Sequence, residues 1–111
     1  MAYDEELAGR LRELVHQEDG VSEKRMFGGL AFLINGNMFV SASGQGDLLV
    51  RVDPAQAERL LDLPHVQPMQ MRGRTMSGWL RVDSEALRTK RQLEPWVRRG
   101  VESAKSLPLK G

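Results

Sequence analysis

The chain has 111 residues, of which 41% are hydrophobic and 28% charged, and it contains no cysteine. This length and composition fit one domain with a single hydrophobic core, and they exclude a multidomain enzyme, a disulfide-stapled secreted miniprotein and a metal site with cysteine ligands. Sixteen basic and fifteen acidic residues give a net charge of +1, so overall charge favours no polyanionic partner.

Charge is unevenly distributed along the chain. Residues 1–50 contain four basic and eight acidic residues, whereas residues 51–111 contain twelve basic and seven acidic residues. The chain begins MAYDEE, which is acidic where a secretory signal is basic. The longest apolar run, residues 30–34, is far shorter than the roughly 20 residues that cross a bilayer. We therefore expect a cytoplasmic protein with no membrane segment.

The N-terminal segment has the pattern of an amphipathic helix over residues 4–17. Asp4 is placed to cap it, and the residues after Asp4 are acidic, as the positive end of the helix dipole favours. Gly20 is suited to ending the helix. The apolar residues recur at the spacing of one buried stripe, which comprises Leu7, Leu11, Leu14 and Val15.

An antiparallel hairpin is predicted next, with strands at residues 25–34 and 37–43. Between them lies Asn35-Gly36, a strong hairpin signal because both residues tolerate a positive φ. A looser turn leads to a third strand at residues 48–52. That strand places Leu48, Val50 and Val52 on one face and Leu49 and Arg51 on the other.

A second helix is predicted to begin at Asp53-Pro54, because Asp53 supplies a capping oxygen and proline is tolerated in the first turn. Gln56 is placed for a capping box, and Pro64 stops the helix. Its expected buried side comprises Ala57, Leu60 and Leu61.

Two further strands of alternating polarity follow, joined by a turn at Gly73-Arg74-Thr75. Alternation divides their side chains between the two faces of the sheet. The face expected to meet the helices carries Met69, Met71, Met76, Gly78, Leu80 and Val82, and the outer face carries Gln70, Arg72, Ser77, Trp79 and Arg81.

The C-terminal part is predicted to be helical. Asp83 or Ser84 caps a short helical turn that reaches about Lys90, and Pro95 is interpreted as the first residue of a new helix. We expect residues 107–111 to form a frayed tail. The apolar residues with a 3.6-residue period are Leu93, Trp96, Val97, Gly100, Val101 and Ala104.

The order of elements is therefore α-β-β-β-α-β-β-α within a single domain, residues 1–111. A five-stranded antiparallel sheet with helices on one face is the natural two-layer solution, which is an α+β fold. The other face of the sheet is left to water or to a partner.

Residues suited to catalysis are sparse. His16 and His65 are expected to be structural or solvated, and with no cysteine and no close carboxylate spacing they give no metal-site pattern. Gly28-Gly29 is predicted inside a strand, which is not the context of a phosphate-binding loop. These glycines more plausibly permit a bulge or a close approach of a neighbouring element. We therefore expect no enzyme and no cofactor.

The outer sheet face is the most interesting feature, because it gathers Arg51, Arg72, Trp79 and Arg81 beside Leu49. Three interpretations stay open. Arginine stems could simply cover Trp79 through a cation–π contact. The group could form the centre of a protein interface or homodimer, where Trp and Arg are enriched. It could also stack on bases of a nucleic acid.

Two other patterns favour ordinary structural roles. The methionines at 26, 38, 69, 71 and 76 fall on predicted strands, where core filling is favoured over an adaptable binding surface. A second basic cluster is interleaved with acidic residues, which favours a solvated face. That cluster comprises Arg88, Lys90, Arg91, Arg98 and Arg99.

Several of these strings together resemble the N-terminal domain of the TfoX/Sxy family of competence regulators. The motif is Arg25-Met26-Phe27-Gly28-Gly29, and a strand and a hairpin follow it. The remaining matches are Asn35-Gly36-Asn37-Met38-Phe39, Leu49-Val50-Arg51-Val52, Thr75-Met76-Ser77 and a late helix with Trp96.

The resemblance covers nearly the whole chain and implies a two-layer α+β fold similar to that of secretion chaperones. It also implies a regulator of natural transformation, of a kind thought to act with the cyclic-AMP receptor protein at promoters. Full-length members carry a C-terminal domain that we expect this chain to lack. The family supplies no catalytic residues. We therefore expect a non-enzymatic protein-interaction module, whose partner is a transcription regulator or a second copy, with direct nucleic-acid binding as the alternative.

Overall fold

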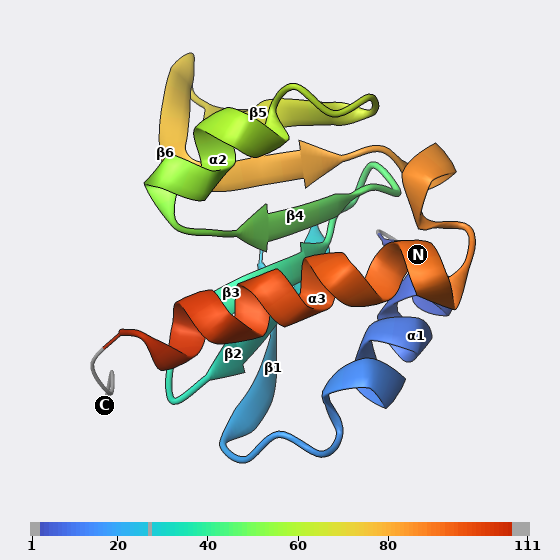
Figure 1. The fold of residues 1–111 in the computed structure, drawn as a ribbon. Coiled ribbons are helices and arrows are strands. Elements are labelled where there is room, and N and C mark those ends of the chain that lie inside the picture. Colours follow the sequence, from blue (N-terminus) through green and yellow to red (C-terminus); the bar gives the residue numbers. More distant parts are fainter. Residues whose placement is uncertain (1–2, 27, 108–111) are drawn as a thin grey trace.

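The computed structural model describes residues 3–26 and 28–107 and shows helices on one side of a curved antiparallel sheet (Figure 1). The helices are α1 (Glu5–Val15), α2 (Pro54–Leu60) and α3 (Lys90–Lys105), with a short 3-10 turn, η1, at Ser84–Leu87. The strands are β1 (Val21–Met26), β2 (Gly29–Ile34), β3 (Asn37–Ala42), β4 (Leu48–Arg51), β5 (Val66–Met71) and β6 (Arg74–Val82).

The sheet has six strands in the order β1-β2-β3-β4-β6-β5, and every neighbouring pair is antiparallel. This confirms the α+β class and the packing of helices against a sheet. The expected five strands and the order α-β-β-β-α-β-β-α were wrong, since the observed order is α-ββββ-α-ββ-α.

The extra strand is β1, because the segment 25–34 is not one strand but contains the end of β1, the turn and all of β2. Gly28 adopts a φ of +76°, a left-handed conformation that reverses the chain between β1 and β2. Gly29 serves the close approach that was considered for this pair, because a Cβ there would collide with the carbonyl oxygen of Ala42 on β3. Phe27 of the same motif lies outside the described residues.

The core lies between the sheet and the helices α1 and α3. Alternation places Val50 of β4 and Leu80 of β6 on the helix side, opposite each other in the register of the two strands. From the helices come Leu11 and Leu93, both fully buried, while α2 adds Ala57 to the same core. Leu61, expected on the buried side of α2, is exposed because the helix ends at Leu60.

The cap residues Asp4 and Asp53 were predicted correctly, whereas the start of α3 was not. Asp4 accepts hydrogen bonds from the amides of the first turn of α1, and Asp53 accepts one from the amide of Ala55. The α3 helix begins at Lys90, not at Pro95, because Thr89 and Gln92 form a capping box.

None of the helices in residues 3–26 and 28–107 has the length and apolarity that a membrane crossing requires. Of the expected tail, residues 108–111 lie outside the described part of the chain.

Candidate functional site

The side of the sheet that faces away from the helices is uncovered, and we call it the open face. Along β4, Leu48 and Val50 enter the core, so Leu49 and Arg51 project from the opposite side. The register of β4 and β6 places Leu49 opposite Arg81 and Arg51 opposite Trp79. The sequence prediction that Trp79, Arg81, Leu49 and Arg51 share this face is therefore confirmed.

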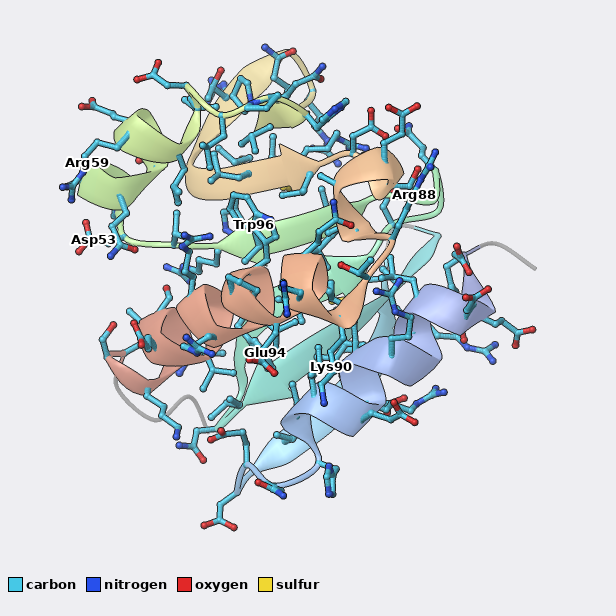
Figure 2. The ribbon with its side chains drawn as sticks, turned by 45° about the vertical axis from the view of Figure 1, so that its right-hand side comes forward. Asp53, Arg59, Arg88, Lys90, Glu94 and Trp96 are labelled. Atoms are coloured by element: carbon cyan, nitrogen blue, oxygen red, sulfur yellow. The ribbon has the colours of Figure 1, made fainter. Side chains whose placement is uncertain are left out.

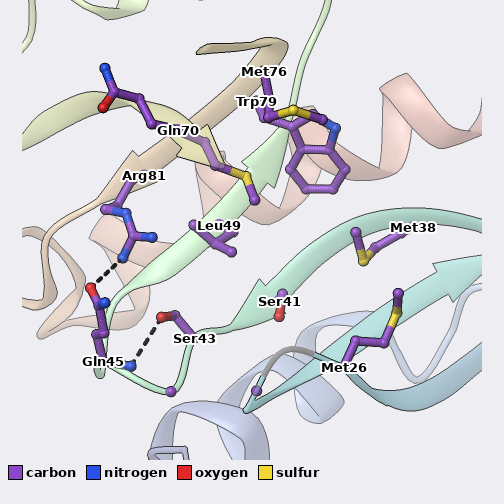
Figure 3. Close-up of a pocket in the computed structure, with 13 residues that line it drawn as sticks. Met26, Met38, Ser41, Ser43, Gln45, Leu49, Gln70, Met76, Trp79 and Arg81 are labelled. Carbon is purple, nitrogen blue, oxygen red and sulfur yellow. Dashed lines mark hydrogen bonds between the residues drawn. The ribbon is translucent and has the colours of Figure 1, made fainter. Parts of the chain in front are cut away.

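A hollow of about 310 Å³ occupies the centre of the open face. Leu49 forms its floor, and the side chains of Trp79, Met38 and Met26 gather around it from separate strands (Figure 3). The wall is predominantly apolar, with polar groups at one end from the β3–β4 loop. We call this cavity the Met/Trp hollow. Its full lining is Met26, Gly29, Met38, Ser41, Ser43, Gly44, Gln45, Leu49, Met69, Gln70, Met76, Trp79 and Arg81.

Methionines line this hollow, although core filling was expected of them. Met26 and Met38 are half-buried and Met76 is 37% exposed, and all three lie outside the core between helices and sheet. Met69 is buried but also lines the hollow. The expected orientation of Met71 concerns a side chain outside the described ones.

Two backbone irregularities explain why Met69 and Met76 lie beside Trp79 and not beside Leu80. Gly78 has a φ of +81°, which breaks the regular alternation of β6 between Met76 and Leu80. A register shift between Pro68 and Gln70 does the same in β5, where Pro68 is the residue opposite Leu80. Simple alternation, on which the prediction rested, does not extend across such bulges.

Arg81 is held in place at the polar end of the hollow. Its guanidinium donates to the carboxylate of Asp47 at 2.7 Å and to the side-chain oxygen of Gln45 at 2.8 Å (Figure 3). Exposure of the two charged side chains is only 25% for Arg81 and 14% for Asp47. The other carboxylate oxygen of Asp47 is buried and has no hydrogen-bond partner among the described residues. Arg81 therefore carries a structural ion pair as well as lining the hollow.

The other two predicted arginines differ from each other. Arg51 is half-buried and lies directly across the ladder from Trp79. Arg72 does not lie on a strand: with Gly73 it makes the tight turn between β5 and β6, at φ values of 53° and 78°. It is exposed and does not line the hollow. Of the three arginines predicted near Trp79, only Arg81 lines the hollow, and methionine side chains form more of its lining.

Within the described chain, the stacked arginine–tryptophan pair is on the helical side. Arg99 lies over the ring of Trp96, 4.7 Å from its centroid, and Arg98 donates to Glu94 at 3.0 Å. Figure 2 shows Arg88, Lys90 and Glu94 on the outside of the helical layer. The second basic cluster is therefore remote from the Met/Trp hollow and partly neutralised.

Sequence spacing missed one group of possible metal ligands. The amide of Asp83 donates to the carbonyl of His65 at 2.9 Å, and this brings Nδ1 of His65 within 3.7 Å of Asp83 and 3.9 Å of Glu85. These atoms are spaced so that they could hold a metal ion. All three residues are exposed, and exposed ion pairs of this kind are common on protein surfaces. His16 is exposed at the end of α1, where its Nδ1 lies 2.7 Å from the carbonyl of Glu13.

A further ion pair joins the sheet to α1. Arg12 donates two hydrogen bonds to Glu23 of β1, at 2.8 and 2.9 Å. These hydrogen bonds hold the pKa of Glu23 below its ordinary value and raise that of Arg12. The contact shows that Glu23 faces the helices, which leaves its neighbour Lys24 on the open face.

Comparison with known protein families places the chain in a family. The model of the TfoX N-terminal domain matches residues 13–104. This range includes all six strands, nearly all of α3 and only the last residues of α1. Among curated proteins, no match was found. The extent of the match shows that the chain belongs to the TfoX N-terminal domain family.

Proposed function

We propose that this TfoX N-terminal domain is a protein-interaction module that works through its open face and has no catalytic role. The family is found in competence regulators and is not known as a catalytic one. A transcription regulator is the kind of partner that family membership suggests, and the cytoplasm is the location that we infer for it.

The observation that carries the proposal is the Met/Trp hollow. Soluble domains normally cover apolar concavities, and an exposed one marks a binding surface. Tryptophan is enriched among the residues that dominate interface energies. Methionine side chains are flexible and polarisable, so they adapt to the shape of a partner. Here Trp79 and four methionines converge on one concave site.

Nucleic-acid binding is the alternative, and the geometry favours it less. A base-stacking platform needs an aromatic face beside free cations. Arg81 is already bound to Asp47 and Gln45, and Arg72 lies in a turn, so of the three predicted arginines Arg51 alone is left beside Trp79 without an ion pair among the described residues. Thioethers surround Trp79 instead.

Affinity purification from extracts of the native cell tests the proposal. Met76→Glu is the main variant, because Met76 is exposed and a carboxylate there disturbs the hollow and not the core. Arg91→Glu is the control, since Arg91 is an exposed residue of α3 on the other side of the molecule. We expect partners captured by the parent chain and by Arg91→Glu to be lost with Met76→Glu. Equal capture by all three would refute a role for the open face.

A titration with single- and double-stranded DNA tests the alternative. Phosphate contacts make affinity fall as salt rises from about 50 to 200 mM. Binding with that dependence, weakened by Arg51→Glu but not by Arg91→Glu, would favour nucleic acid over protein as the partner.

A further inference from the structure

The charge on the open face has one sign along the strands. Glu23 is the single acidic residue in the six strands, and it points to the helix side, where it binds Arg12. The open face instead carries Lys24 on β1 and Arg51 on β4, in addition to the paired Arg81. Neither Lys24 nor Arg51 lines the hollow itself, but Arg51 is paired with Trp79 in the sheet and Lys24 lies two residues before Met26 on the same face of β1. The structure gives neither cation an ion pair among the described residues.

The dimensions of the hollow limit what can enter it. A volume of about 310 Å³ lies at the lower end of the range for ligand pockets, about 300–1,000 Å³. The hollow is open to the surface and lined by Leu49, Trp79 and methionines. It is therefore suited to one aromatic or branched side chain whose neighbours along a peptide rest on the surrounding open face, which carries the two cations.

A second copy of this chain is a poor occupant. Two identical open faces that meet around a two-fold axis bring the same patch into contact with itself. Lys24 and Arg51 would then approach the cations of the other copy with no strand carboxylate to neutralise them. Like charges at an interface disfavour association.

We propose that the open face binds a peptide segment of a partner protein in which a hydrophobic anchor is flanked by acidic residues. This inference rests on the proposed function and specifies the chemistry of its partner. The anchor fills the Met/Trp hollow, and the flanking carboxylates lie over Lys24 and Arg51. Opposite charge at the rim adds selectivity and a faster encounter to the apolar contact.

A selection from a random peptide library on the immobilised chain, with prior removal of peptides that bind Met76→Glu, tests the proposal. We expect the selected peptides to contain Phe, Leu or Trp next to Asp and Glu. A synthetic peptide with a central Phe-Leu pair between acidic residues should bind on the order of tenfold tighter than its counterpart with lysines. This difference should shrink as salt rises.

Charge reversal provides the matched comparison. Lys24→Glu with Arg51→Glu should reverse the preference to the lysine peptide, whereas Arg91→Glu should leave it unchanged. Selected peptides with basic flanks would overturn the acidic partner and leave the open face as a binding surface. Equal binding of the synthetic acidic peptide to Met76→Glu and to the parent chain would overturn the proposed function as well.

Two other results count against the peptide. No enrichment over Met76→Glu would overturn it, while the capture experiment above would still decide the proposed function. Sedimentation that shows self-association of the parent chain, lost in Met76→Glu, would identify a second copy as the occupant and overturn the acidic segment.

Discussion

The substitution Gly29→Ala offers the sharpest test of the fold, because it adds one methyl group at a place with no room. Gly29 begins β2, and its position beside β3 is so close that a Cβ would run into the carbonyl oxygen of Ala42. The next nearest atoms are the Cα of Ser43 at 3.2 Å and the carbonyl carbon of Ala42 at 3.3 Å. All of these are backbone atoms at the end of β3 and in the residue that follows it, so no side-chain rotation can relieve the contact.

Relief therefore requires β2 and β3 to separate, which weakens the ladder and the packing behind it. Overpacking of this kind costs typically 1–3 kcal/mol, and we take about 2 kcal/mol. A domain of about 100 residues loses roughly 4 °C of melting temperature per kcal/mol, so the midpoint should fall by about 8 °C.

Thermal unfolding followed by circular dichroism measures this difference, with Gly9→Ala as the matched control. Gly9 lies in α1, and a Cβ there meets no atom within 4 Å. Alanine in a helix is favoured over glycine by roughly 0.5–1 kcal/mol, so Gly9→Ala should raise the midpoint. Unfolding of Gly29→Ala at the parent temperature would refute the close approach of the two strands.

Three further outcomes are expected. The hydrogen bonds from Arg12 lower the pKa of Glu23, so the stability that they add is complete above the ordinary glutamate pKa and is lost as pH falls through the lowered pKa. The free energy of unfolding should therefore fall less steeply with acid in Glu23→Gln than in the parent chain. Identical curves for the two proteins would contradict the pairing. Arg81→Ala should lower the free energy of unfolding by about 1–3 kcal/mol, because it leaves the mostly buried Asp47 unpaired, and in urea denaturation the double variant with Asp47→Ala should recover part of the loss. Thr89→Ala removes the α3 cap and should cost about 1 kcal/mol by the same measurement, whereas no change would mean that the helix is held by packing alone.

Local signals in the sequence predicted the elements whose ends depend on a few neighbouring residues. Asp4 and Asp53 were identified as caps, and Asn35-Gly36 as a tight turn, because each acts through its own backbone or that of the next two or three residues. The apolar stripe of α3 was also correct, although Pro95 concealed the first turn of that helix. Thr89 and Gln92 carried the signal that would have located it.

The residues of the Met/Trp hollow were harder to predict. Trp79 was placed correctly by alternation, but Met69 and Met76 were assigned to the core because they are apolar and because the bulges near Pro68 and Gly78 were not recognised. A glycine inside a strand pattern is a known sign of such a bulge.

Contacts between distant segments had no counterpart in the sequence pattern. Arg81 was expected on the outer face of the sheet, but its ion pair with Asp47, which is 34 residues away, was not predicted. The residues next to Arg81 in the sequence give no signal of that ion pair, because the strand order β3-β4-β6 is what brings the β3–β4 loop to the end of β6. The same holds for His65 beside Asp83 and Glu85.

The separation of the two sides of the sheet has a consequence for how such a domain diversifies. Met26, Met38 and Met76 take no part in the packing beneath the helices, so exchange at these positions changes what the surface accepts while the folding energy stays with residues such as Leu80 and Leu93. If the open face binds partners as we propose, a handful of substitutions there can retarget the domain without first acquiring compensating, stabilising ones.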